Sequence, residues 1–96
     1  MTVSLSTHVL DTAAGGPAAR VAVELLQGDE QVARAQTDAD GRVRLAESLD
    51  PGTYRLVFYP PSPFFTRVEL EIVLEDGHYH VPLLISPFSC ASYRGS

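Results

Sequence analysis

The sequence predicts an all-β fold, a β-sandwich. Three observations predict it: apolar and polar residues alternate with a period of two, turn signals of Gly, Pro and Asp recur about every eight to twelve residues, and no segment has the period of a helix. With 96 residues, the chain is too short for two hydrophobic cores. We therefore expect one domain that covers residues 1–96.

The first half of the chain supplies four expected strands. They cover residues 2–8, 21–25, 32–35 and 42–45. Val3 and Leu5 share one face of the first, because successive side chains of a strand point to opposite sides. A Gly-Asp pair at 28–29 turns the second strand back into the third as a hairpin. A further turn at 37–41, in which Gly41 is able to take positive φ, leads into the fourth.

The second half supplies four more expected strands. They cover residues 53–59, 65–74, 78–86 and 88–93. A proline cluster at 60–63 must end the first of them, since proline has no N–H to give to a sheet. The segment 65–74 alternates most strictly, with aliphatic residues on one face and charged ones on the other. The apolar run 81–85 indicates a strand buried on both faces.

Composition argues against several kinds of partner. Seven basic residues against 12 acidic ones give a net charge of −5, which would repel a phosphate backbone, so nucleic acid is not an expected partner. No apolar run reaches membrane-spanning length, and residues 1–10 lack the leader pattern of a signal peptide. We expect no membrane association and a cytoplasmic protein. Cys90, as the one cysteine, predicts neither an internal disulfide nor a cysteine zinc site.

The histidines offer the most chemistry, because imidazole titrates near neutral pH. His8 ends the first strand, where the plain interpretation is a ring that faces solvent. His78 and His80 share one face of a strand, and they would hold a metal ion only with a third ligand, which the sequence does not supply. Asp38 and Asp40 are interpreted as turn formers, because the pattern of a calcium loop is missing. We predict no metal and no other cofactor.

A set of motifs along the chain points to a known family. The motifs are Ser6–Asp11 (STHVLD), Thr37–Arg42 (TDADGR), Tyr79–Leu84 (YHVPLL), Ser86–Phe88 (SPF) and Tyr93–Ser96 (YRGS). Read together, they closely resemble the transthyretin-like 5-hydroxyisourate hydrolases. The terminal motif separates these hydrolases from the transthyretin hormone carriers, which resemble this chain in fold but lack these histidines and that ending.

This resemblance implies a fold, an assembly and a reaction. The fold would be a sandwich of two four-stranded sheets. The assembly would be a homotetramer, a dimer of dimers in which subunits pair edge to edge and pairs stack face to face around a central channel. The reaction would be hydrolysis of 5-hydroxyisourate to 2-oxo-4-hydroxy-4-carboxy-5-ureidoimidazoline in purine catabolism, without a cofactor.

The resemblance also implies site residues in the channel. It assigns catalytic roles to His8, His80 and Ser96, and substrate binding to Arg42, Tyr93 and Arg94. We expect one histidine to take a proton from water, while Arg42 holds the carbonyl oxygens through its fork of donors. Ser96 would orient a histidine or the water through its hydroxyl and carboxylate. The choice of His8 or His80 as the general base stays open. His78 is expected to support the site residues without contacting the substrate.

The sequence departs from the family pattern in two places. The connection from Phe58 to Val68 is shorter than in typical members, so the short family helix is expected to be absent, and Cys90 stands where an aromatic residue is common.

One alternative function is that of a transthyretin-like carrier that binds a small ligand without turnover; buried histidines and an arginine would be costly in such a channel. An immunoglobulin-like interaction module is the other alternative, and it predicts no channel.

Overall fold

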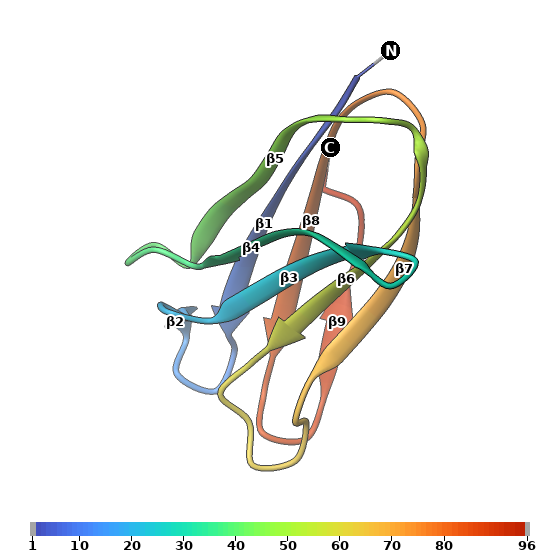
Figure 1. Ribbon diagram of the computed structural model, residues 1–96. Helices are drawn as coiled ribbons and strands as arrows, with labels where there is room; N and C mark the ends of the chain where they lie inside the picture. The colour runs from blue at the N-terminus through green and yellow to red at the C-terminus, as the bar shows by residue number, and fades with distance from the viewer. Residues whose placement is uncertain (1, 96) are drawn as a thin grey trace.

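Nine strands and no helix make up residues 2–95, the part of the chain that the computed structural model describes (Figure 1). The strands are β1 (Val3–Asp11), β2 (Gly16–Pro17), β3 (Ala22–Gln27), β4 (Glu30–Gln36), β5 (Arg42–Leu49), β6 (Gly52–Tyr59), β7 (Val68–Leu74), β8 (Gly77–Ile85) and β9 (Cys90–Ser92). The all-β prediction is confirmed.

The strands form two sheets that pack face to face (Figure 1). One sheet has the order β4-β3-β6-β7. In the other, β1 lies between β5 and β8, and β9 follows β8 at the edge. Every pairing is antiparallel except that of β1 with β8, which is parallel. Each sheet contributes four main strands, as expected.

The short β2 is an addition to the expected pattern. A turn after Asp11 brings Gly16 and Pro17 back beside the end of β1, which makes that sheet five-stranded. The carboxylate of Asp11 accepts the backbone N–H groups of Ala13 and Ala14, both at 3.0 Å, and stabilises this turn. The sequence predicts only a turn in this stretch, because two residues are too few to show an alternating pattern.

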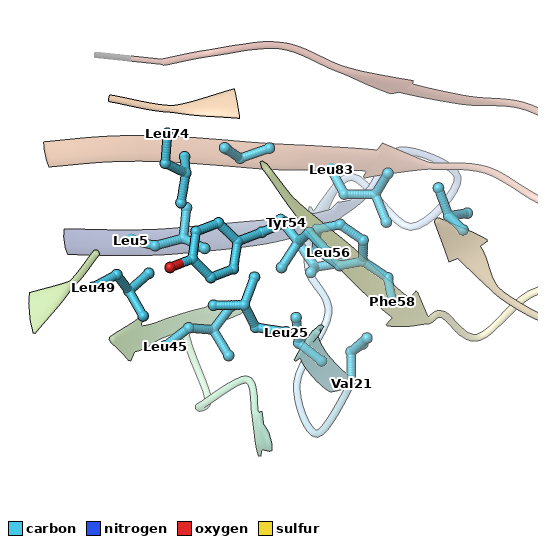
Figure 2. Packing of buried hydrophobic residues seen from close by; sticks show 14 of the residues in the cluster. Leu5, Val21, Leu25, Leu45, Leu49, Tyr54, Leu56, Phe58, Leu74 and Leu83 are labelled. Carbon is cyan, nitrogen blue, oxygen red and sulfur yellow. The ribbon is translucent and has the colours of Figure 1, made fainter. Parts of the chain in front are cut away.

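Alternation along the strands creates the core between the sheets. The inner face of β1 buries Val3, Leu5 and Val9 completely. Opposite them, β6 contributes Leu56 and Phe58, and Figure 2 shows both side chains in one cluster with Leu5. Because such burial removes apolar surface from water, the period of two fixes which face of each strand points inward.

The strand β7 begins at Val68 rather than at residue 65 as predicted. The hydroxyl of Ser62 accepts the N–H groups of Phe64 at 3.1 Å and Phe65 at 2.9 Å, and donates to the carbonyl of Pro87 at 3.0 Å. These bonds hold the backbone in a turn, so it reaches the sheet only at Val68. From there the predicted alternation is confirmed, with a core-facing set of Val68, Leu70, Ile72 and Leu74.

The prediction of burial on both faces of 81–85 is confirmed, since Val81, Pro82 and Leu83 are all buried. The reason lies in the topology, because β8 is flanked by β1 on one side and β9 on the other. The inner face packs into the core between the sheets. The outer face of β1 and the first half of β8 remain polar, and this is where the histidines lie.

Candidate active site

The register of three strands brings the predicted polar residues together on the outer face of one sheet. In the parallel pair, Ser6 of β1 lies opposite His80 of β8. In the antiparallel pair, His8 of β1 lies opposite Arg42 of β5. Since side chains two residues apart on a strand share a face, His8, Arg42 and His80 project from neighbouring positions on one side of the sheet.

His80 is half-buried and hydrogen-bonded through one ring nitrogen. Its Nδ1 lies 2.9 Å from the hydroxyl oxygen of Ser6. Burial lowers the pKa of His80 below its ordinary 6.5, and the neighbouring basic side chains of His8, His78 and Arg42 lower that pKa further. The ring is therefore held in its neutral form, which has a free lone pair able to accept a proton.

His8 is oriented by the turn before β5. Its Nε2 lies 2.9 Å from the backbone carbonyl oxygen of Asp40. Because a carbonyl oxygen only accepts hydrogen bonds, Nε2 must carry the proton, and the lone pair of the neutral ring is then on Nδ1. His8 is fixed in one tautomer, whereas the contact of His80 is with a hydroxyl, which both donates and accepts.

Arg42 is placed by the turn that precedes it. The carboxylate of Asp38 accepts the N–H groups of Asp40 at 2.9 Å and Arg42 at 3.0 Å, so Asp38 acts as the predicted turn former. Gly41 has a φ of 76° in this turn, the positive φ expected for it. Among residues 2–95, the exposed guanidinium of Arg42 makes no hydrogen bond or ion pair, so its donors are available to a ligand.

A groove of about 360 Å³ lies over this part of the sheet. Ser6, Asp38, Arg42, Arg44 and His80 line it. A planar molecule of the size of a purine ring could place its oxygens on the arginines and a ring edge near His80. His8 stands beside the groove, next to Arg42.

The structure places Tyr93 and Arg94 elsewhere. The guanidinium of Arg94 lies 4.0 Å above the ring of Tyr79, and it donates to the carbonyl oxygen of His78 at 3.3 Å. Tyr93 and Arg94 line a different groove, of about 470 Å³, between β7 and the C-terminal segment. Within one subunit they are thus separate from the groove of His80, and their role in substrate binding stays a prediction.

The C-terminal segment returns to His80 at Gly95. The N–H of Gly95 donates to the carbonyl oxygen of His80 at 2.6 Å. A methyl group on Gly95 would come within 2.8 Å of Cδ2 of the His80 ring, so this position requires glycine for its close approach. Ser96, predicted to be catalytic, lies outside the described residues.

Two serines and His78 also belong to this surface. Ser4 and Ser6 share the outer face of β1 with His8, and both contact His78. Neither serine was predicted as a site residue from the sequence. Their positions four and two residues before His8 were the available signal, but a serine on an exposed strand face is common and carries no chemistry until its partner is known.

Two other kinds of site are absent from residues 2–95. No three residues of the His, Cys, Asp and Glu types are grouped so that they could hold a metal ion. No helix in this part of the chain is long and apolar enough to cross a membrane.

A two-sheet sandwich with two histidines and an arginine on the outer face of one sheet defines a transthyretin-like protein that carries a polar site. Family comparison agrees with this class. The chain belongs to the HIUase/Transthyretin family, whose model matches residues 5–95.

Individual relatives give the same picture. A 5-hydroxyisourate hydrolase of Caulobacter vibrioides is 42% identical over 112 aligned positions, which cover 96% of this chain and 97% of the relative. The structure of Klebsiella pneumoniae 5-hydroxyisourate hydrolase has a TM-score of 0.90 at 36% identity, and covers 98% of this chain and 99% of that chain. Sea bream transthyretin in complex with thyroxine has a TM-score of 0.84 at 29% identity, with 95% and 93% covered.

Proposed function

We propose that this chain is a 5-hydroxyisourate hydrolase that opens its substrate with a histidine-activated water and an arginine that binds the substrate. One observation carries the proposal: the β5-β1-β8 register brings His8, Arg42 and His80 to one outer face. The name of the 42% identical relative from Caulobacter vibrioides supports the choice of substrate. The product would be 2-oxo-4-hydroxy-4-carboxy-5-ureidoimidazoline.

In the proposed reaction, His80 acts as the general base. Its lowered pKa keeps the ring neutral, and because Nδ1 is bonded to Ser6, Nε2 is the nitrogen left for water. The water oxygen bonds to a ring carbonyl carbon, and the proton of that water passes to His80. The carbon–nitrogen bond then breaks, and the same proton moves to the leaving nitrogen.

Arg42 stabilises the negative charge that develops on the carbonyl oxygen during this attack. Its planar guanidinium offers several N–H donors in a fixed geometry, which suits the adjacent oxygens of an oxidised purine ring. His8, held by the carbonyl of Asp40, stands beside Arg42 and contributes to the same electrostatic environment.

The remaining predicted residues would enter through assembly. In a homotetramer of stacked dimers, the outer face of the β1 sheet would meet a second subunit, and Tyr93, Arg94 and Ser96 of either subunit could complete the channel. The open outer face and the approach of Gly95 to His80 support this arrangement. The tetramer and the cytoplasmic location remain predictions from the sequence.

The proposal is tested by producing 5-hydroxyisourate in situ with urate oxidase and following its ultraviolet decay. The purified chain is expected to accelerate this decay well above the rate in buffer. The complex of sea bream transthyretin with thyroxine favours a second candidate, a ligand carrier. Decay at the buffer rate, together with saturable binding of an aromatic ligand such as thyroxine by the folded protein, would support the carrier instead.

The activity is expected to depend on pH through His80. A base acts only when deprotonated, so kcat/KM should rise with pH and reach its plateau above the pKa of the ring. Because burial lowers the pKa of His80, the midpoint of this rise should lie below about 6.5, the ordinary value for histidine. Initial rates between about pH 5 and 8 measure it; a midpoint above 7 would contradict the assignment of His80 as the base.

A further inference from the structure

A chain of hydrogen bonds runs along the outer face from His80 to solvent. Nδ1 of His80 lies 2.9 Å from the hydroxyl oxygen of Ser6. The same oxygen lies 3.0 Å from Nε2 of His78. Nδ1 of His78 lies 2.6 Å from the hydroxyl oxygen of Ser4. His80 is half-buried while His78 is exposed, so the chain connects the groove with bulk water.

The positions of these groups follow from the parallel pairing of β1 with β8. Ser4 lies opposite His78, and Ser6 lies opposite His80. Both strands are in extended conformation, so the two serines alternate with the two rings along one face. The ring of His78 spans the two hydroxyls, with a different nitrogen on each.

Counting donors leaves two arrangements in which the hydrogen of Ser6 points to one of the two rings; in a third, Ser6 accepts from both rings and its own hydrogen has no partner in the chain. A hydroxyl has one hydrogen, and a neutral imidazole has one N–H and one lone pair. If His80 donates from Nδ1 to Ser6, the hydrogen of Ser6 points to Nε2 of His78, and His78 donates from Nδ1 to Ser4. If every bond reverses, Ser4 donates to His78, His78 donates to Ser6, and Ser6 donates to His80. In the first two arrangements the two rings have the same tautomer.

We propose that Ser6 and His78 are positioning residues that couple the tautomer of His80 to that of His78 and pass a proton between His80 and solvent at Ser4. The catalytic part of this inference rests on the proposed hydrolase function; the coupling of tautomers does not.

The proton count balances in each direction. When Nε2 of His80 takes a proton from the attacking water, Nδ1 releases one to Ser6, Ser6 passes its own to His78, and His78 releases one through Ser4 to solvent. When Nε2 then donates to the leaving nitrogen, the chain takes one proton back at Ser4 and returns to its first arrangement. No bond other than O–H and N–H changes along the chain.

The surrounding charges explain why such a chain helps. Towards His80, β1 presents His8 and β5 presents Arg42 and Arg44, of which Arg44 forms an ion pair with Glu47. The groove also contains the carboxylate of Asp38. Arg94 is engaged elsewhere: it donates to the carbonyl oxygen of His78 and stacks on the ring of Tyr79. A positive charge on His80 is unfavourable among these cations, and reversal of the chain lets His80 exchange protons without keeping that charge.

The direct test is the tautomer state of the histidines in the ligand-free protein, measured by 15N NMR of the imidazole nitrogens. In the wild type, His78 and His80 are expected to show equal fractions of the Nδ1–H form at pH 7.5. In Ser6→Ala the link is lost, and the two fractions should differ. Unequal fractions in the wild type, or fractions that stay equal in Ser6→Ala, would overturn the proposed coupling.

Kinetics test the catalytic part. Ser6→Ala and His78→Gln are expected to lower kcat by about 10–100-fold with KM within about 3-fold, since supporting partners of a catalytic histidine commonly have effects of that size. Ser6→Thr, which keeps the hydroxyl, should restore most of the activity. Ser89→Ala, at an exposed hydroxyl after β8, is the matched control and should leave kcat unchanged.

The outcomes separate the two proposals. A wild type without activity but with coupled tautomers means that the hydrolase function fails and the hydrogen-bond chain stands. If the wild type is active, and Ser6→Ala changes neither kcat nor the rise of kcat/KM with pH, the hydrogen-bond chain has no catalytic role. The imidazole spectra of each variant also report whether it is folded, and Ser6→Thr tests the hydroxyl with the least change in packing.

Discussion

Replacement of Arg42 by alanine is expected to lower kcat/KM for 5-hydroxyisourate by about 100–1,000-fold, the usual loss when a donor to a developing oxyanion is removed. Arg42 lies opposite His8 in the strand pair, lines the groove with His80, and has no internal partner among residues 2–95. Its guanidinium therefore has no structural contact to lose, and stability should change by less than about 0.5 kcal/mol.

The matched controls for Arg42→Ala lie on the same chain. Arg34→Ala removes the same charge from an exposed position on β4, in the opposite sheet, and should leave kcat/KM within about 2-fold. Arg42→Lys keeps the charge but not the planar fork of donors, so it should recover only part of the activity. Comparable rates for Arg42→Ala and Arg34→Ala in the urate oxidase-coupled assay would remove Arg42 from the mechanism.

Replacement of Gly41 by alanine should produce the largest loss of stability for one added methyl group. Gly41 has a φ of 76°, which costs a residue with Cβ about 1–2 kcal/mol. The new Cβ would also lie 2.5 Å from the carbonyl oxygen of Val9 and 3.2 Å from the backbone nitrogen of Ala18. These are backbone atoms joined by a hydrogen bond of 2.9 Å, so neither moves without disturbing β1.

We expect Gly41→Ala to lower the free energy of unfolding by more than about 3 kcal/mol, a large part of the stability of a small domain. Gly28→Ala is the matched control, because Gly28 has a φ of 60° but nothing within 4 Å of its added Cβ. That variant should lose only about 1 kcal/mol. Urea unfolding of the three proteins measures both values, and a difference below about 0.5 kcal/mol between the variants would contradict the steric explanation.

Local patterns in the sequence were sufficient to identify the eight main strands, although not the short β2 or the start of β7. The period of two identified the core-facing residues of β7, and the apolar run 81–85 indicated burial on both faces of β8. Asp38 and Gly41 predicted the turn that contains them. Such features depend only on near neighbours in the chain, because alternation and turn conformation are properties of a few consecutive residues. The resemblance of the motifs then indicated the family.

The tertiary structure decided which of these strands meet and in what register. Nothing in the spacing of Ser6 and His80, 74 positions apart, shows that β1 and β8 are parallel neighbours or that one ring faces one hydroxyl. The same structure places Arg94 on the ring of Tyr79, away from the groove of His80, although Arg94 and His80 both belong to the predicted site. The physical reason is that side-chain direction follows from local geometry, whereas contacts between distant strands follow from how the whole chain buries its apolar faces.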